Sequence, residues 1–300
     1  MINGVINVYK EKGYTSHDVV AKLRGIFKQK KIGHTGTLDP QAEGVLPVCL
    51  GNGTKLCDML TDKRKEYVAE FLFGITTDTQ DMTGSVVSEK KVSVTPEEAR
   101  EAILGFLGGY EQVPPMYSAC KVNGKRLYEL AREGKEVKRS ARPVTIYELE
   151  ILSMELPEAT IRVVCSKGTY IRTLCHDIGQ RLGCGAAMKT LLRTRVDRFA
   201  LSDAKKLSEI EEIVRAGEEG RIVLPVDEMF AGLPAVTVKE AFSGAVQNGN
   251  PLFLRQIIGK SGWTDGEQVR VYDCEGRFYG IYAFFVMKGC FKPVKMFLER

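Results

Sequence analysis

The feature that most constrains the fold is the irregular order of strand-like and helix-like segments. Runs rich in β-branched and aromatic residues lie at 5–10, 44–50, 65–74, 143–152 and 159–171. Between them, helical patterns occur at uneven intervals, without the regular strand-helix period of a doubly wound fold. We therefore expect an α+β body: a mixed, largely antiparallel sheet flanked by helices.

Two helix starts are predicted from capping chemistry. Thr15 is followed three residues later by Asp18, and Thr95 by Glu98, which is the spacing of a capping box. The first helix continues with apolar residues on one face, and its exposed side is basic. The second is expected to run to the glycines that begin at Gly108. A further helix is expected at 172–183 and a shorter one that stops at Gly134.

The chain changes character near residue 233. Gly and Pro residues precede this point, and a short helix and two apolar runs around a Cys-Glu-Gly turn at 274–276 follow it. The two runs predict a β-hairpin. We expect two domains, a body at 1–232 and a small β-rich module at 233–300, and we expect a polar turn over 75–87.

Positive charge is concentrated in two stretches. The chain has 300 residues and a net charge of +5. Every charge between Val20 and Leu38 is positive, and eight basic residues outnumber three glutamates from Lys121 to Arg142. A single run of this kind is usually a solvated helix face. Two runs, each beside a Gly-rich or Pro-rich loop, favour a polyanionic partner.

The cysteines and histidines do not form a metal-binding pattern. Eight cysteines are scattered without a CxxC pair, which predicts buried reduced thiols. His176 beside Cys175 has no second pair to complete a tetrahedral site, so no metal is expected. No run approaches the roughly 20 apolar residues of a spanning helix, and residues 1–13 do not resemble a signal peptide. We expect a cytoplasmic protein without membrane contact.

The octapeptide GHTGTLDP at 33–40 presents one carboxylate, Asp39, among glycines. It is not a phosphate-binding P-loop, because the required spacing of Gly, Gly-Lys and Ser or Thr is missing. Asp39 before Pro40 could be an ordinary turn residue. Alternatively, Pro40 favours an extended Asp39, and the glycines leave room for a ligand. The residues alone leave both readings open.

Longer stretches carry a specific resemblance. GHTGTLDPQAEGVLPVCLGNGTKL closely resembles the signature of tRNA pseudouridine synthases of the bacterial TruB type. The resemblance continues in KEYVAEFLFG, ITTDTQDMTG, QVPPMYSACKVNGKRLYELAREG, CSKGTYIRTL and LLRT, and covers roughly residues 3–230. It implies a pseudouridine synthase fold, isomerisation of uridine 55 in the T-arm of tRNA, no cofactor and no metal. The C-terminal module resembles the PUA-like domains that family members use to contact RNA.

The resemblance assigns a role to Asp39, which matches the catalytic aspartate of the family. A carboxylate suits this chemistry, since breaking a glycosidic bond while keeping the base requires an electron-poor sugar to be stabilised or captured. Whether Asp39 attacks the sugar, attacks the uracil or removes a ribose proton stays open. Arg172 matches the cation expected to hold Asp39 ionised against desolvation.

Four other residues match substrate-binding positions of the family. Tyr67 corresponds to the tyrosine that stacks on the uracil, and Tyr170 and Leu191 to the lining of the same pocket. His34 corresponds to the histidine that holds the T-loop open after the uridine has been flipped out. Without the resemblance, Tyr67 would be read as a core residue of a strand and His34 as a turn residue.

Three departures from the family pattern and two rival functions complete the expectations. Gln41, Glu66 and Leu192 stand where the family usually has other residues, and Leu192 puts one contact in doubt, although not the reaction. The basic runs and C-terminal module would also suffice for an RNA-binding protein without activity. An N-ribosyl hydrolase would release free uracil instead. We expect a monomer whose partner is the T-arm stem-loop of tRNA.

Overall fold

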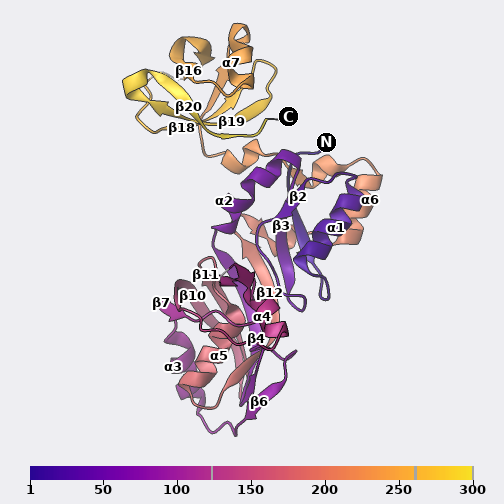
Figure 1. Cartoon of the computed structure of the whole chain (residues 1–300), viewed down its shortest axis with the longest axis vertical. Coiled ribbons are helices and arrows are strands. Elements are labelled where there is room, and N and C mark those ends of the chain that lie inside the picture. The colour runs from indigo at the N-terminus through magenta and orange to yellow at the C-terminus, as the bar shows by residue number, and fades with distance from the viewer. Residues whose placement is uncertain (123, 260–261, 299–300) are drawn as a thin grey trace.

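The computed structural model describes residues 1–122, 124–259 and 262–298, and three units follow one another along its long axis (Figure 1). The C-terminal module lies at one end, and the body forms the rest. The body is built on a ten-stranded sheet in the order β14-β1-β3-β12-β4-β11-β10-β7. Its strands are β1 (Gly4–Lys10), β3 (Glu43–Leu50), β4 (Lys65–Phe73), β7 (Gly108–Gln112), β10 (Arg142–Glu155), β11 (Glu158–Cys165), β12 (Ala186–Val196) and β14 (Val223–Leu224), with β2 (Ile32–His34) beside β3 and β13 (Phe199–Ala200) beside β12.

The sheet divides into two halves at one short contact. Among the described pairs of this sheet, only β3 and β12 run parallel, and they pair through Leu192 with Glu43 and Arg193 with Gly44. We call β14, β1, β3 and β2 the first half, and β12, β4, β11, β10 and β7 the second half. All other described pairs of the sheet are antiparallel, which confirms the predicted mixed, largely antiparallel architecture.

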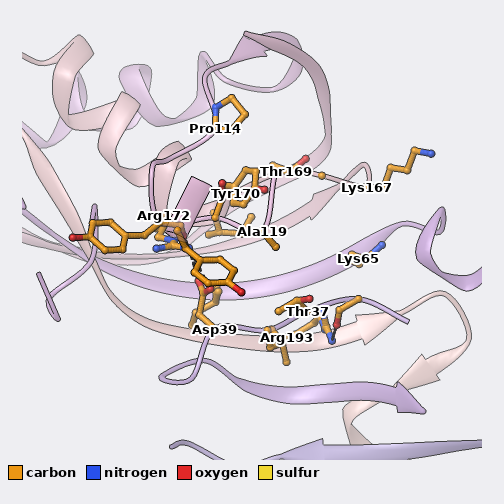
Figure 2. Close-up of a pocket in the computed structure, with 18 of the residues that line it drawn as sticks. Thr37, Asp39, Lys65, Pro114, Ala119, Lys167, Thr169, Tyr170, Arg172 and Arg193 are labelled. Carbon is orange, nitrogen blue, oxygen red and sulfur yellow. Dashed lines mark hydrogen bonds and ion pairs between the residues drawn. The ribbon is translucent and has the colours of Figure 1, made fainter. Parts of the chain in front are cut away.

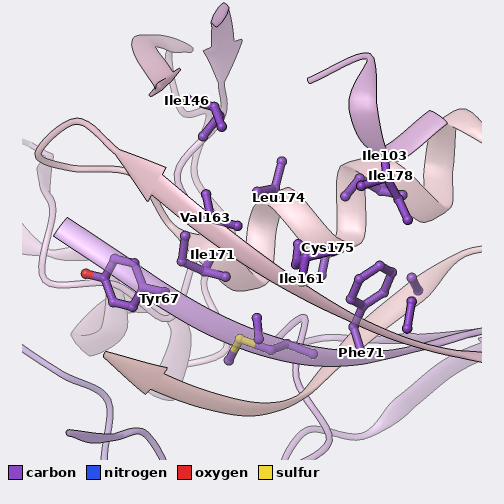
Figure 3. Packing of buried hydrophobic residues seen from close by; sticks show 14 of the residues in the cluster. Tyr67, Phe71, Ile103, Ile146, Ile161, Val163, Ile171, Leu174, Cys175 and Ile178 are labelled. Carbon is purple, nitrogen blue, oxygen red and sulfur yellow. The ribbon is translucent and has the colours of Figure 1, made fainter. Parts of the chain in front are cut away.

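Each half has its own hydrophobic core. Helices α1 (Ser16–Ile26) and α6 (Leu207–Arg215) cover the first half with a cluster that includes Val19 and Leu23. Helices α3 (Pro96–Leu104) and α5 (Ile171–Arg181) cover the second half. Figure 3 shows Ile103 of α3 and several α5 side chains against Phe71 and the β11 residues. The chain also forms α2 (Cys57–Thr61), α4 (Leu127–Arg132) and α7 (Ser243–Gln247), with 3-10 turns at 51–56, 201–203, 219–221, 227–230, 240–242, 254–256 and 286–288.

The predicted helix starts are confirmed, but one helix end is wrong. Thr15 with Asp18 and Thr95 with Glu98 form reciprocal capping boxes at α1 and α3. Helix α3 ends at Leu104 and not at the later glycines, which belong to β7. At the C-cap, a Cβ on Gly105 would lie 2.2 Å from the Arg181 guanidinium of α5. The C-terminal end of α3 therefore packs closely against Arg181 of α5, a tertiary contact that overrides the local sequence pattern.

Three regions contain strands that the sequence did not reveal. The segment predicted as a polar turn forms a hairpin of β5 (Ile75–Thr77) and β6 (Val86–Glu89). Strand β12 pairs along its length with β4. In the loop at 113–141, β8 (Lys121–Val122) and β9 (Lys125–Arg126) pair with each other.

The C-terminal module is β-rich, as predicted. Its six-stranded sheet has the order β16-β20-β19-β18-β15-β17, formed by β15 (Ala235–Val238), β16 (Leu252–Phe253), β17 (Ile257–Ile258), β18 (Gln268–Tyr272), β19 (Phe278–Phe285) and β20 (Cys290–Met296). Strands β18 and β19 form the predicted hairpin. The module contacts the body through Tyr272, whose hydroxyl donates to Asp227 at 2.9 Å, and through Asn52, which donates to the Phe297 carbonyl at 3.1 Å. The division at 232/233 stays a prediction.

The thiols match their prediction in part. All eight cysteines are free, and five of them are buried: Cys49, Cys165, Cys175, Cys184 and Cys290. Cys274 is exposed because it lies in the turn between β18 and β19, and Cys57 and Cys120 are half-buried. Among the helices of the described residues, none combines the length and apolar character needed to cross a bilayer.

Candidate active site

A cleft of about 1360 Å³ opens where the two halves meet (Figure 2). The GHTGTLDP loop runs from β2 to β3 along one wall. Residues of α1 and β1 fix this loop. The Ser16 hydroxyl accepts from Leu38 N at 2.9 Å, and the Lys10 ammonium donates to the carbonyls of Pro40 and Ala42 at 3.1 and 2.6 Å. Asp39 therefore stands on a loop with a defined backbone path.

Asp39 of the first half faces Arg172 of the second half. The Arg172 Nη2 atom lies 3.2 Å from Asp39 Oδ1 and 3.0 Å from Oδ2. Arg172 is the second residue of α5, is only 5% exposed, and also donates to the Tyr117 carbonyl at 2.8 Å. The predicted pairing of Asp39 with a guanidinium is present, and residues 133 positions apart in sequence form it.

A second carboxylate, Asp81, reaches the same guanidinium. Its Oδ2 lies 3.7 Å from Arg172 Nη1, and its Oδ1 accepts from Thr83 N at 2.9 Å and from Thr79 Oγ1 at 2.8 Å. Asp81 is not among the predicted site residues, because the polar residues of 75–87 indicate a turn. The available signal was its position inside ITTDTQDMTG, one of the segments that carried the resemblance.

The electrostatic balance at Asp39 differs from the expectation. Burial raises the pKa of Asp39, Arg172 and Lys10 lower it, and Asp81 raises it. The net direction is upward from 3.8, so burial outweighs the guanidinium. The Asp39 side chain is nevertheless 39% exposed, so the carboxylate is accessible from the cleft.

The two tyrosines occupy different depths of the cleft. Tyr67 on β4 is 7% exposed and lies opposite Arg193 of β12; burial raises the pKa of its phenol, and Arg193 opposes that rise. Tyr170 caps α5, and its backbone is clamped by the buried Gln112, whose side chain accepts from Tyr170 N at 2.8 Å and donates to Tyr170 O at 3.0 Å. Leu191 also lines the cleft.

His34 lies at the start of the loop and is half-buried. Its ring meets that of His17 edge-on at 5.4 Å between centroids, and both line the cleft. Burial, together with the nearby His17 and Arg193, lowers the pKa of His34 to about 4. The ring is therefore neutral at neutral pH.

Two buried cations, which the sequence reasoning did not single out as site residues, flank the other side of the loop. Arg193 is 1% exposed and donates to the carbonyls of Val45 and Gly36 at 2.6 and 3.2 Å. Lys65 is 8% exposed and donates to the carbonyls of Thr61 and Lys63, each at 2.8 Å. Burial, reinforced by Arg193, lowers the pKa of Lys65 to about 8.

The two basic runs lie differently relative to the cleft. Arg126, Arg132 and Arg142 of the second run line it, although Asn123 lies outside the described residues. The cations between Val20 and Leu38 are exposed on α1 and the turn after it, outside the lining. Within the described residues, no group of three or more His, Cys, Asp or Glu side chains could hold a metal. The absence of a metal and of a cofactor stays a prediction.

Comparisons with known proteins agree along the chain. Residues 24–171 match the N-terminal domain model of the TruB family of pseudouridylate synthases, 172–231 match the C-terminal domain model of tRNA pseudouridylate synthase B, and 234–282 match the model described as pseudouridine synthase II TruB, C-terminal. The tRNA pseudouridine synthase B of Lachnoclostridium phytofermentans is 52% identical over 99% of this chain and its own whole length. That of Clostridium novyi is 54% identical over 93% of this chain and 95% of its own.

Solved structures resemble the whole chain as well. A chain of an H/ACA RNP bound to a substrate RNA containing 2′-deoxyuridine superposes with a TM-score of 0.69 at 26% identity, covering 99% of this chain and 86% of that chain. A chain of a Cbf5-Nop10-Gar1 complex gives a TM-score of 0.70 at 28% identity, covering 99% of this chain and 85% of that one.

Proposed function

The chain belongs to the TruB family of pseudouridylate synthases, and from this premise we propose that it isomerises uridine 55 in the T-arm of tRNA to pseudouridine. Its close relatives carry the name tRNA pseudouridine synthase B. The observation that carries the proposal is the Asp39 carboxylate, held 3.0 Å from Arg172 inside a cleft that Tyr67 and Tyr170 also line.

Asp39 is the proposed catalytic residue. The reaction breaks the bond between N1 of uracil and the ribose, turns the base and joins its C5 to the same ribose carbon. A carboxylate can stabilise the electron-poor sugar or capture it covalently. Arg172 positions this carboxylate and opposes its protonation. The structure is compatible with attack on the sugar, attack on the uracil ring or removal of a ribose proton.

The apolar and aromatic lining has a separate role in the proposal. Water that reached the activated sugar would produce hydrolysis, so the cleft must exclude it. Tyr67 and Leu191 provide apolar surface, and the hydrogen bonds from Gln112 fix the backbone position from which the Tyr170 side chain extends. We propose that Tyr67 stacks on the base and that its hydroxyl takes part in removing the C5 proton.

The rim of the cleft suits a folded RNA. Seven Lys or Arg side chains and three aspartates are among the described residues that line it. We propose that Arg126, Arg132 and Arg142 on one side, and the exposed cations of α1 on the other, contact phosphates of the T-arm. The neutral His34 would fill the space left by the flipped uridine. Such phosphate contacts position the RNA, and binding weakens with salt.

The test is incubation of the protein with a T-arm stem-loop, followed by nucleoside analysis. The proposal expects pseudouridine at position 55 and no free uracil. Free uracil would identify an N-ribosyl hydrolase. Tight binding without either product would identify an RNA-binding protein without activity. We further propose that the enzyme acts as a monomer in the cytoplasm, with the domain division at 232/233 and without a cofactor.

A further inference from the structure

The cleft has a positively charged end that the proposed chemistry does not use. In Figure 2, Thr37, Arg193 and Lys65 lie to the right of Asp39, whereas Arg172 lies to its upper left. The Lys65 ammonium donates to two main-chain carbonyls and, in the part of the chain that the structure describes, makes no ion pair with a carboxylate. The same holds for the Arg193 guanidinium within the described residues.

A nearly buried ammonium without a counterion is costly in a folded protein. Desolvation penalises the charge, and a neighbouring like charge adds to the penalty. Both effects act on Lys65, since it is buried and Arg193 is close, and together they outweigh the opposing effect of the nearby Asp62. An anion that enters the cleft would relieve them, and would gain charge-assisted hydrogen bonds from a donor that is already fixed in place.

The loop backbone leaves space for such an anion. A Cβ on Gly36 would lie 3.7 Å from Lys65 Cε and 3.8 Å from Arg193 Nη1, so this glycine keeps a side chain out of the space beside both cations. Thr37 next to it is exposed and lines the cleft. At the rim, the exposed Lys167 adds another cation, paired with Asp62 at 2.7 Å.

We propose that Lys65, with Arg193 and Thr37, forms a phosphate subsite for one backbone phosphate that flanks the flipped uridine. The inference rests on the proposed function, because it assumes an RNA whose sugar lies at Asp39. It assigns Lys65 to substrate positioning: the subsite fixes the nucleotide backbone on one side of the sugar while Asp39 acts on the other.

The experiment combines a protein variant with a change in the RNA. Lys65→Met removes the ammonium, and Lys63→Met is the matched control, because Lys63 lies outside the cleft lining and is exposed, with an ion pair to Asp197 at 3.8 Å. Stem-loops carrying a single neutral methylphosphonate on either side of the target uridine remove one phosphate charge at a time. Dissociation constants are measured over a range of salt concentrations.

The proposal expects Lys65→Met to weaken binding about ten-fold or more, as the loss of a hydrogen bond between charged groups does. For Lys65→Met, the plot of log K against log salt should become less steep by about 0.7 to 0.9, the value for one phosphate contact. One methylphosphonate should weaken the wild type to the same extent and leave Lys65→Met unaffected. Lys63→Met should behave as the wild type.

The proposal is overturned if Lys65→Met binds within two-fold of the wild type with an unchanged salt slope. It is also overturned if, for each of the two methylphosphonates, the loss of affinity adds to the loss caused by Lys65→Met. Should Lys65→Met fail to fold, the wild-type protein still decides: no sensitivity to either methylphosphonate overturns the subsite. Failure of the proposed function is a different result, since it would appear as no pseudouridine from the unmodified stem-loop and the wild-type enzyme.

Discussion

The two halves of the large sheet are built alike but contribute different chemistry to the cleft. Each is a set of strands covered by two helices over its own apolar core. The first half supplies the Asp39 carboxylate on a glycine-containing loop, whereas the second supplies the Arg172 guanidinium, Tyr67, Tyr170 and Leu191. Because Asp39 and Arg172 belong to different halves, the distance between them depends on the narrow junction at Gly44 and Arg193.

The largest effect is expected from closing the space at this junction. A Cβ on Gly44 would lie 2.2 Å from the carbonyl oxygen of Arg193, and its φ of +104° disfavours other residues. Gly44→Ala should lower the free energy of unfolding by about 3 kcal/mol or more and abolish activity. Chemical denaturation of the variant measures this.

Gly13→Ala is the matched control for that prediction. Gly13 has a φ of +92°, but nothing lies within 4 Å of its Cβ position. Gly13→Ala therefore introduces backbone strain without steric overlap, and it should lower the free energy of unfolding by about 1 kcal/mol. Equal losses for the two variants would show that the junction is not tightly packed.

The next effect concerns the residue that joins the halves electrostatically. Arg172→Leu should lower turnover by at least about 100-fold, in the range seen when an electrostatic partner of a reacting group is removed. Arg181→Leu, which changes an exposed arginine on the same helix, should leave turnover near the wild-type value.

The pH profile separates this role of Arg172 from a purely structural one. The pKa of Asp39 is raised, and the proposed reaction uses its ionised form, so activity should fall as the pH decreases through that pKa. Without Arg172, burial and Asp81 act with less opposition, and the acidic limb should move to higher pH. If the acidic limb of the residual activity of Arg172→Leu lay at the same pH as in the wild type, the electrostatic pairing of Arg172 with Asp39 would be refuted.

The smallest effect compares one helix start from each half. Thr15→Ala and Thr95→Ala each remove one capping box, and each should cost about 1 kcal/mol of stability. Thr15 lines the cleft and precedes Ser16, which holds the loop, whereas Thr95 does not line it. Only Thr15→Ala should therefore also slow turnover, measured at a temperature where both variants are folded.

Local signals in the sequence were sufficient for much of the fold. Capping boxes, the hairpin around 274–276 and the dense β-branched strands depend on neighbouring residues, and these predictions are confirmed. Strand β12 was not predicted, because the Ala, Met, Lys and Leu residues at its N-terminal end do not favour a strand. It is extended because β4 pairs with it over most of its length.

The site was predictable to the extent that family motifs carried it. Asp39 and Arg172 were named from the resemblance, and the structure brings them together. Asp81 could not be placed, since its position beside Arg172 depends on tertiary contacts, among them the bridge between Asp81 and Met188. The raised pKa of Asp39 also depends on burial between segments that are distant in sequence. Tertiary contacts of this kind leave no periodic signal.

The most direct test of the account compares the wild type with Asp39→Asn on the T-arm stem-loop, with turnover and RNA affinity measured in parallel. Asparagine keeps the size of the side chain and removes its charge. The account predicts that pseudouridine formation falls by at least about 1,000-fold while affinity changes by less than about three-fold, within what one uncharged contact contributes. Turnover within ten-fold of the wild type would contradict it, because a carboxylate at this position would then not be needed.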